Sequence, residues 1–185
     1  MTQRHTPGLH RGHEIRGSAK IGGETLPPGL HMLESIKNFR RVDEQLLTSG
    51  QPSEAQLATV AAHGVEIVIN LALHDDPRYS LSDEAGLVAS LGLDYVHIPV
   101  QFAQPTEQDL RAFFDAMDAN RGRHMLVHCA ANLRVSAFLG LYGVIREERD
   151  RDDAFALMHG LWEPNEVWAD FIEQMLSNKA LADRA

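Results

Sequence analysis

Cys129 and Arg134 stand five residues apart at the end of a short apolar run, within the segment 124–139. The apolar run is typical of a buried strand, and the residues after the pair show the three- or four-residue apolar spacing of a helix. The first amides of a helix lack intrahelical partners, so a strand, a tight loop and a helix N-terminus form a site for anions. These residues therefore predict a thiol nucleophile that faces an anion-binding site.

The thiol of Cys129 has three neighbours that favour its ionised form. They are the dipole of the helix that begins near Leu133, the guanidinium of Arg134 and the imidazole of His128. A thiolate can attack a phosphorus or sulfur centre, while the arginine and the loop amides bind the oxygens of the transferred group. Cys129 could instead be a small buried hydrophobic residue, as free cysteine often is, but its position and its arginine partner favour catalysis.

The bulk composition describes one ordinary globular domain. The chain has 185 residues, of which 44% are hydrophobic and 23% charged. No apolar run approaches the roughly 18 residues of a membrane helix, and no secretion signal is recognisable at the N-terminus, so we expect a cytoplasmic protein. Its single cysteine excludes an internal disulfide and a multi-cysteine zinc site. The net charge of −9 argues against nucleic acid and anionic membrane as partners, so a local positive site must capture any anionic substrate.

Residues 1–31 differ from the rest of the chain. They are rich in glycine and proline and show no sustained apolar period, which predicts a flexible tail or a strap on a domain that spans 32–185. His5, His10 and His13 lie in this stretch, but no cysteine or carboxylate completes a metal site there. We therefore expect neither a metal nor another cofactor.

The elements that must position Cys129 alternate between strands and helices. This order predicts an α/β fold with a mostly parallel central sheet and helices on both faces. In such sheets ligands bind beyond the carboxyl ends of the strands, which is where Cys129 lies. The predicted strands are 65–71, 95–100 and 124–128, and the predicted helices are 53–63, 82–91, 105–117, 133–145 and 166–176.

The loop from His128 and Cys129 to Arg134 resembles the signature of the cysteine-based protein tyrosine and dual-specificity phosphatases. Over residues 38–176 the chain resembles a bacterial phosphatase-like group of that superfamily, most clearly at 48–53, 64–71, 95–100 and 162–165. The resemblance implies hydrolysis of a phosphomonoester through a phosphocysteine, with a phosphorylated small molecule or a phosphoprotein as partner.

The same resemblance implies a role for each residue of the loop. Cys129 is the implied nucleophile, and Arg134 stabilises the transition state. From its place beside Cys129, we expect His128 either to shape the loop and the hydrogen bonding of the thiolate or to have a purely structural role. The residues implied to hold the phosphate are Ala130, Ala131, Asn132 and Leu133.

The loop departs from the phosphatase pattern in its length. Four residues separate Cys129 from Arg134, where the phosphatases have five. The shorter loop has one fewer backbone amide to bind the phosphate, and it rotates the residues that follow by about 100° around the helix axis. The hydroxyl residue directly after the arginine in the family is Val135 here, with Ser136 one position later. We therefore expect Ser136 and the side chain of Asn132 to contribute to anion binding.

The general acid of the phosphatases also lacks an obvious counterpart. The loop after the strand 95–100 begins with Gln101, which cannot supply a proton, although it could contact the substrate. Asp75 or Asp76, after the preceding strand, could substitute, but both also suit a solvated turn. Because loss of a general acid typically costs about 10²–10⁴-fold in rate, we expect slow turnover.

Two other functions remain open from the sequence. Rhodanese-type sulfurtransferases also have four residues between their cysteine and a basic or polar residue, and a Cys129 persulfide would need no general acid. The surrounding motifs nevertheless resemble the phosphatases. The third hypothesis is a phosphatase-derived domain that binds an anion or a partner without catalysis.

Overall fold

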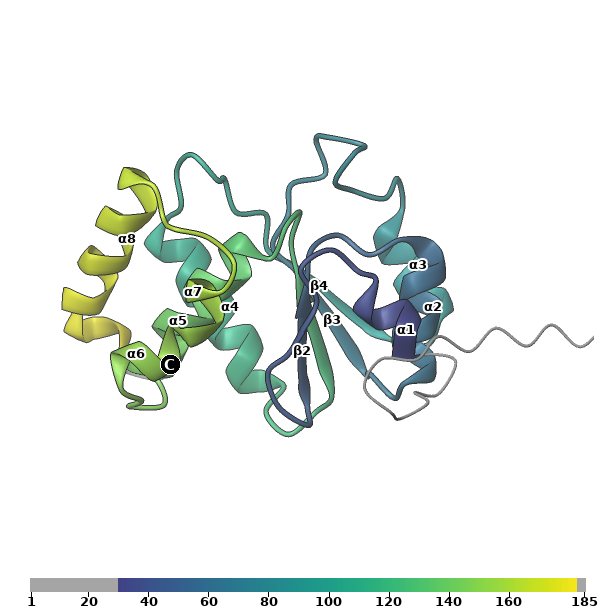
Figure 1. Ribbon diagram of the computed structural model, residues 1–185, viewed down its shortest axis with the longest axis horizontal. Helices are drawn as coiled ribbons and strands as arrows, with labels where there is room; N and C mark the ends of the chain where they lie inside the picture. The colour runs from purple at the N-terminus through teal and green to yellow at the C-terminus, as the bar shows by residue number, and fades with distance from the viewer. Residues whose placement is uncertain (1–29, 183–185) are drawn as a thin grey trace, which may run out of the picture.

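The computed structural model describes residues 30–182 (Figure 1). The predicted tail 1–31 lies outside these residues, except for its last two positions, which belong to helix α1 (Leu30–Glu34). None of the helices within the described range is long and apolar enough to cross a membrane.

A five-stranded sheet forms the centre of the fold, in the order β1-β2-β5-β3-β4. The strands are β1 (Arg40–Arg41), β2 (Leu46–Ser49), β3 (Ile67–Asn70), β4 (Asp94–His97) and β5 (Met125–His128). The β1–β2 pair is antiparallel, and the three other strand pairs of this sheet are parallel. The central strands β2, β3 and β5 are buried along their whole length, as expected for apolar strands covered on both faces. The predicted fold class is confirmed.

Helices cover the two faces of the sheet in separate groups (Figure 1). One face carries α1, α2 (Glu54–Ala62) and α3 (Glu84–Ser90). The other carries α4 (Glu107–Ala119), α5 (Leu133–Ile145), α6 (Arg151–Ala154), α7 (Ala156–His159) and α8 (Glu166–Ser177), and a 3-10 helix, η1 (Lys179–Leu181), ends the described chain. Two hydrophobic clusters follow from this division, one under each group of helices.

The alternation of side chains along β5 assigns each of its residues to one face. Leu126 packs in the cluster under α1–α3, whereas Val127 and Cys129 pack in the cluster under α4–α8. Because successive side chains of a strand point to opposite faces, the last residue of β5, His128, faces the same side as Leu126. The two neighbours His128 and Cys129 are thus separated by the sheet.

The helix starts follow signals that the sequence carries. Ser53 and Gln56 form the predicted capping box of α2, and Thr106 with Asp109 forms a second one at α4. Helix α5 differs, since its N-cap Asn132 has a left-handed backbone (φ 64°) and makes no side-chain cap bond. The entry to α5 is therefore shaped by the loop and not by a standard cap.

Gly140→Ala is expected to destabilise the fold, although alanine normally favours a helix by about 1 kcal/mol over glycine. A Cβ atom on Gly140 would overlap the ring of Phe155, which is buried against α5. Overpacking of this kind costs about 1–3 kcal/mol, so a net loss of about 1–2 kcal/mol is expected in a urea titration. Gly143→Ala is the matched control, because its Cβ would lie 3.0 Å from that of Ala154 and requires a smaller shift. A variant at position 140 as stable as the wild type would contradict this packing.

Candidate active site

Cys129 and Arg134 line one cavity of about 210 Å³ at the junction of β5 and α5. Its other walls are Phe102, Ala130, Ala131 and Leu133. The thiol-bearing residue is only 1% exposed, so a reagent reaches it through this cavity. The structure thus brings together the predicted nucleophile, the predicted arginine and three of the four residues predicted to hold the anion.

The segment 49–51, which precedes α2, is hydrogen-bonded to the loop that follows β5. The amide of Cys129 donates to the carbonyl of Ser49 (3.3 Å), and the amide of Gln51 donates to the carbonyl of Ala130 (3.3 Å). Gly50 lies between them, and a Cβ atom there would stand 3.0 Å from the Ala130 oxygen. The loop therefore rests against backbone that leaves no room for a side chain.

Asn132 supports the loop instead of turning its side chain into the cavity. Its side-chain amide donates to the carbonyl of Asn38 (2.8 Å) and to the hydroxyl of Thr48 (2.9 Å). The predicted donation from this side chain to the anion does not fit that arrangement. The backbone of Asn132 is left-handed, a conformation that lets successive amides face one concavity.

Arg134 is fixed in place although the loop before it is short. Its Nη1 donates to the carbonyl of Leu71, directly after β3, at 2.8 Å. The guanidinium carbon also lies 5.8 Å from the centre of the Phe102 ring. A backbone carbonyl and an aromatic face thus hold the guanidinium beside the cavity of Cys129, where it can meet an anion. The carbonyl of Leu71 has no side-chain signal by which sequence could identify it.

Phe102 forms the aromatic wall of the cavity. The indole of Trp168 donates to its carbonyl (2.8 Å), and the rings of Trp162 and Trp168 lie 5.9 and 5.6 Å from its ring. The two tryptophans therefore pack against this wall and fix its position. Phe102 itself was missed, although a single aromatic residue in an otherwise small and polar loop was a usable signal.

Ser136 and Gln101 are not brought to the cavity. The Ser136 hydroxyl donates to the carbonyl of Leu133 (2.8 Å) and accepts from the indole of Trp162 (3.1 Å). Gln101 is exposed, and the following residue, Phe102, takes the place beside Arg134. The predicted contacts of these two side chains with a substrate therefore find no support in the geometry.

Asp75 and Asp76 lie on the loop after β3, and neither lines the cavity of Cys129. Arg78 donates to both oxygens of Asp76, at 3.0 Å from Nε and 2.7 Å from Nη2. These hydrogen bonds hold the pKa of Asp76 below its usual range. A carboxyl that stays ionised cannot act as the proton donor, so the structure argues against Asp76 as the general acid.

His128 contacts a carboxylate on the far face of the sheet. Its Nε2 lies 2.6 Å from Oε1 of Glu84, the first residue of α3, and both side chains are fully buried. The prediction that His128 serves the hydrogen bonding of the thiolate is wrong, because neighbouring residues of a strand point to opposite faces. Sequence reasoning missed Glu84. Its spacing of four from the buried Val88, on one face of α3, was the available signal.

The charge of Glu84 is predicted to make folding stability depend on pH. Burial alone raises the pKa of Glu84, but the contact with His128 and a hydrogen bond from Gln51 outweigh it and hold the pKa below its usual 4.5. The resulting stability is present above about pH 4.5 and is lost as the pH falls through the folded pKa. Urea titrations between about pH 7 and about pH 3 should show a steeper loss for the wild type than for Glu84→Gln. The exposed Glu44→Gln serves as control, and equal slopes for all three proteins would contradict the argument.

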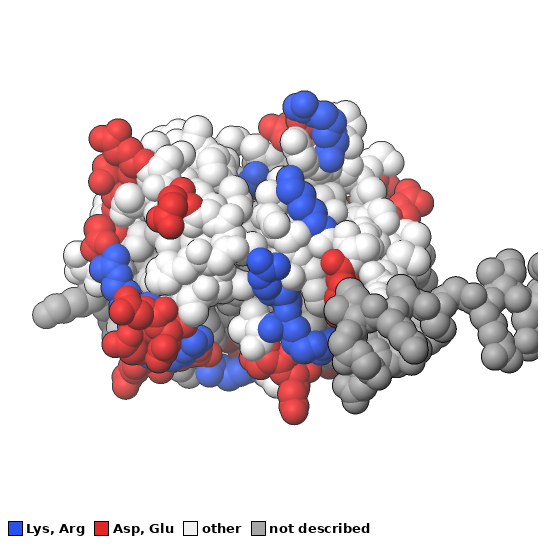
Figure 2. Space-filling model, viewed as in Figure 1, with Lys and Arg blue, Asp and Glu red and all other residues white. Residues whose placement is uncertain are grey.

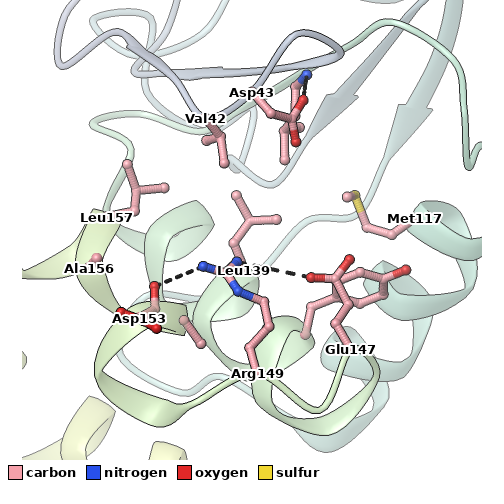
Figure 3. Close-up of a pocket in the computed structure, with 12 residues that line it drawn as sticks. Val42, Asp43, Met117, Leu139, Glu147, Arg149, Asp153, Ala156 and Leu157 are labelled. Carbon is pink, nitrogen blue, oxygen red and sulfur yellow. Dashed lines mark hydrogen bonds and ion pairs between the residues drawn. The ribbon is translucent and has the colours of Figure 1, made fainter.

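A larger cavity, of about 300 Å³, lies away from Cys129 (Figure 3). Leu46, the first residue of β2, lines it, whereas Cys129 follows the last residue of the parallel strand β5. Its cation Arg149 donates to the carbonyl of Asp153 and lies 4.0 Å from Glu147. The cavity lies at the opposite strand ends, its described lining offers no cysteine, and its cation is already paired, so we do not assign the active site there.

Comparison with known proteins identifies a family and several relatives that this chain matches. The model of the family described as "Beta-lactamase hydrolase-like protein, phosphatase-like domain" matches residues 38–144. The beta-lactamase hydrolase-like protein of Xylella fastidiosa is 32% identical over 120 residues, which make up 64% of this chain and 28% of that protein. The chain therefore spans less than a third of the length of the curated relatives that it matches.

Solved structures show the same fold. A DUF442 protein from Shewanella putrefaciens CN-32 superposes with a TM-score of 0.70 at 33% identity, covering 79% of this chain and 95% of that one. A Neisseria meningitidis protein superposes with a TM-score of 0.60 at 16% identity, covering 75% and 98%. The second similarity concerns the fold alone.

Proposed function

The chain belongs to the family of the beta-lactamase hydrolase-like protein, phosphatase-like domain, within the cysteine-based phosphatase superfamily, and we propose that it hydrolyses a phosphomonoester through Cys129. The observation that carries the proposal is the shared cavity of Cys129 and Arg134 at the N-terminus of α5. A thiol, a fixed guanidinium and unpaired helix amides together suit a nucleophile and a cradle for an oxyanion.

The proposed reaction has two steps. The Cys129 thiolate attacks phosphorus, the bond to the leaving oxygen breaks, and Arg134 with the loop amides binds the remaining oxygens. Water then attacks the phosphocysteine, which releases inorganic phosphate and restores the thiolate. Among the residues that the structure describes, none that lines the cavity carries a carboxyl group, so the leaving oxygen takes its proton from water. Without a general acid, the protein should prefer substrates with good leaving groups and should hydrolyse alkyl phosphates slowly.

The distribution of charge on the surface favours an anionic substrate. The chain carries a net charge of −9, yet the face shown in Figure 2 has a band of basic side chains over its middle, with acidic ones mostly toward the ends and the lower edge. Local positive potential of this kind attracts anions against the overall charge. The proposed substrate class is a phosphorylated small molecule or a phosphoprotein.

A second candidate is sulfur transfer, and the absence of a carboxyl group among the described residues that line the cavity favours it. The Cys129 thiolate would attack the outer sulfur of thiosulfate, release sulfite and become a persulfide. An acceptor such as cyanide would then remove that sulfur as thiocyanate. Neither step needs a general acid, and four residues between cysteine and arginine suit this chemistry.

Parallel assays separate the candidates. The wild type is incubated with an aryl phosphate and, separately, with thiosulfate plus cyanide, with Cys129→Ser as the blank in both. Release of phosphate supports the proposed phosphatase, whereas thiocyanate alone replaces it with a sulfurtransferase. If neither product forms but phosphate binds in a calorimeter, the protein is a binding domain without catalysis.

A further inference from the structure

Glu84 is a buried carboxylate on the α1–α3 face of the sheet. It contacts three residues, each of which is joined to a part of the active site on the other face. The Glu84 side chain is fully buried at the start of α3, although charged side chains are rarely buried without a strong reason. Its Oε1 lies 2.6 Å from Nε2 of His128, and its Oε2 accepts from Gln51 Nε2 (3.0 Å) and Asn70 Nδ2 (3.2 Å). A further ionisable group, the His74 imidazole, lies 3.9 Å from the same Oε2.

Each of the three partners is joined to a part of the nucleophile site. His128 is the residue directly before Cys129. The backbone amide of Gln51 donates to the carbonyl of Ala130, the residue directly after Cys129. The carboxylate thus holds the chain on both sides of the nucleophile.

Asn70 joins the same carboxylate to the arginine. It is the last residue of β3, and the next residue, Leu71, provides the carbonyl that accepts from Arg134. The amide of Leu71 also donates to the carbonyl of His128 (2.8 Å), which ties the ends of β3 and β5 together. One carboxylate therefore bears on the placement of both Cys129 and Arg134.

We propose that Glu84 is a positioning residue, which sets the active-site loop by holding His128, Gln51 and Asn70 at once. It touches neither the substrate nor the thiol, because it lies across the sheet from Cys129. The inference rests on the proposed nucleophilic role of Cys129. It extends that role by placing a determinant of the loop geometry in α3, on the opposite face from the catalytic helix α5.

The test measures alkylation of Cys129, the only cysteine in the chain, by mass spectrometry. At about pH 10 a thiol is largely ionised, so the rate of iodoacetamide labelling reports how open the loop is. We expect labelling of Glu84→Gln to be at least about fivefold faster than that of the wild type. The inorganic phosphate concentration that gives half protection should rise about tenfold.

The matched control is Asp83→Ala, which removes the N-cap of α3 but leaves the carboxylate of Glu84 in place. It should lower the melting temperature, while labelling and protection stay within about twofold of the wild type. Gln51→Leu removes one partner at a half-buried position and provides a milder variant should Glu84→Gln fold poorly. It should shift both readouts in the same direction, and the double variant should exceed Glu84→Gln by little.

The outcomes separate the two proposals. Labelling and protection unchanged in folded Glu84→Gln would overturn the positioning role, as would an equal change in Asp83→Ala, which would point to the helix as a whole. If phosphate fails to protect even the wild type, the proposed phosphatase function fails. The labelling rates without phosphate then still decide whether Glu84 sets the loop.

Discussion

Cys129→Ser is expected to lower turnover at least about 10³-fold, whichever group the protein transfers. A serine hydroxyl is far less acidic than a thiol, and the cavity of Cys129 offers no base to activate it: its described lining residues include neither histidine nor a carboxylate. The serine is nearly the same size, and position 129 is 1% exposed, so the loop should keep its shape.

The measurement is kcat/KM for the better of the two substrates, with calorimetry to show that the variant still binds the anion. Cys129→Ala provides a second variant that lacks any nucleophilic atom. If either variant keeps more than about a tenth of wild-type activity, covalent catalysis by this residue is wrong.

Arg134→Lys is expected to lower kcat/KM for a phosphomonoester about 10²–10³-fold. Lysine keeps the positive charge but lacks the planar fork with which arginine binds two oxygens of a phosphoryl group. It also cannot reproduce both the bond to the Leu71 carbonyl and the contact of the guanidinium with the Phe102 ring. The main loss should appear in kcat, because arginine stabilises the charge on the transferred phosphoryl group most strongly in the transition state.

Arg78→Lys is the matched control for this substitution. Arg78 lies in an exposed loop and pairs with Asp76, away from the cavity, so its replacement should change kcat/KM less than about twofold. Urea titrations of both variants should accompany the kinetics, since Arg134 is buried and its bond to Leu71 contributes to stability. An Arg134→Lys enzyme within about threefold of the wild type would show that the guanidinium does not contact the reacting group.

Local patterns in the sequence predict well the strands and helices that position this site. The β-branched and apolar run 65–71 and the apolar run 124–128 became the central strands β3 and β5, because strands buried on both faces need continuous apolar residues. The capping box at Ser53 and Gln56 opened α2 as expected. The pairing of Cys129 with Arg134 also follows from the sequence, because both flank the start of one helix.

The side-chain directions inside the loop were less predictable. Asn132 and Ser136 have groups that suit an anion, yet both bond to neighbouring parts of the protein instead. His128 was expected to serve the thiolate, but the pleat of β5 sends it to the opposite face. Apart from the Leu133 carbonyl, which is three residues from Ser136, the partners of these groups lie 26 to 94 positions away, and no local pattern reveals them.

The amino-acid sequence alone determined the chemistry that this protein can offer: one thiol and one arginine at a helix N-terminus, with four residues between them instead of five. That follows from identity and spacing, which are local properties of the chain. Only the tertiary structure decided how the short loop still aims Arg134, through the Leu71 carbonyl and the ring of Phe102. It also revealed Glu84 behind the loop, because strands and helices that are distant in sequence become neighbours only when the sheet assembles.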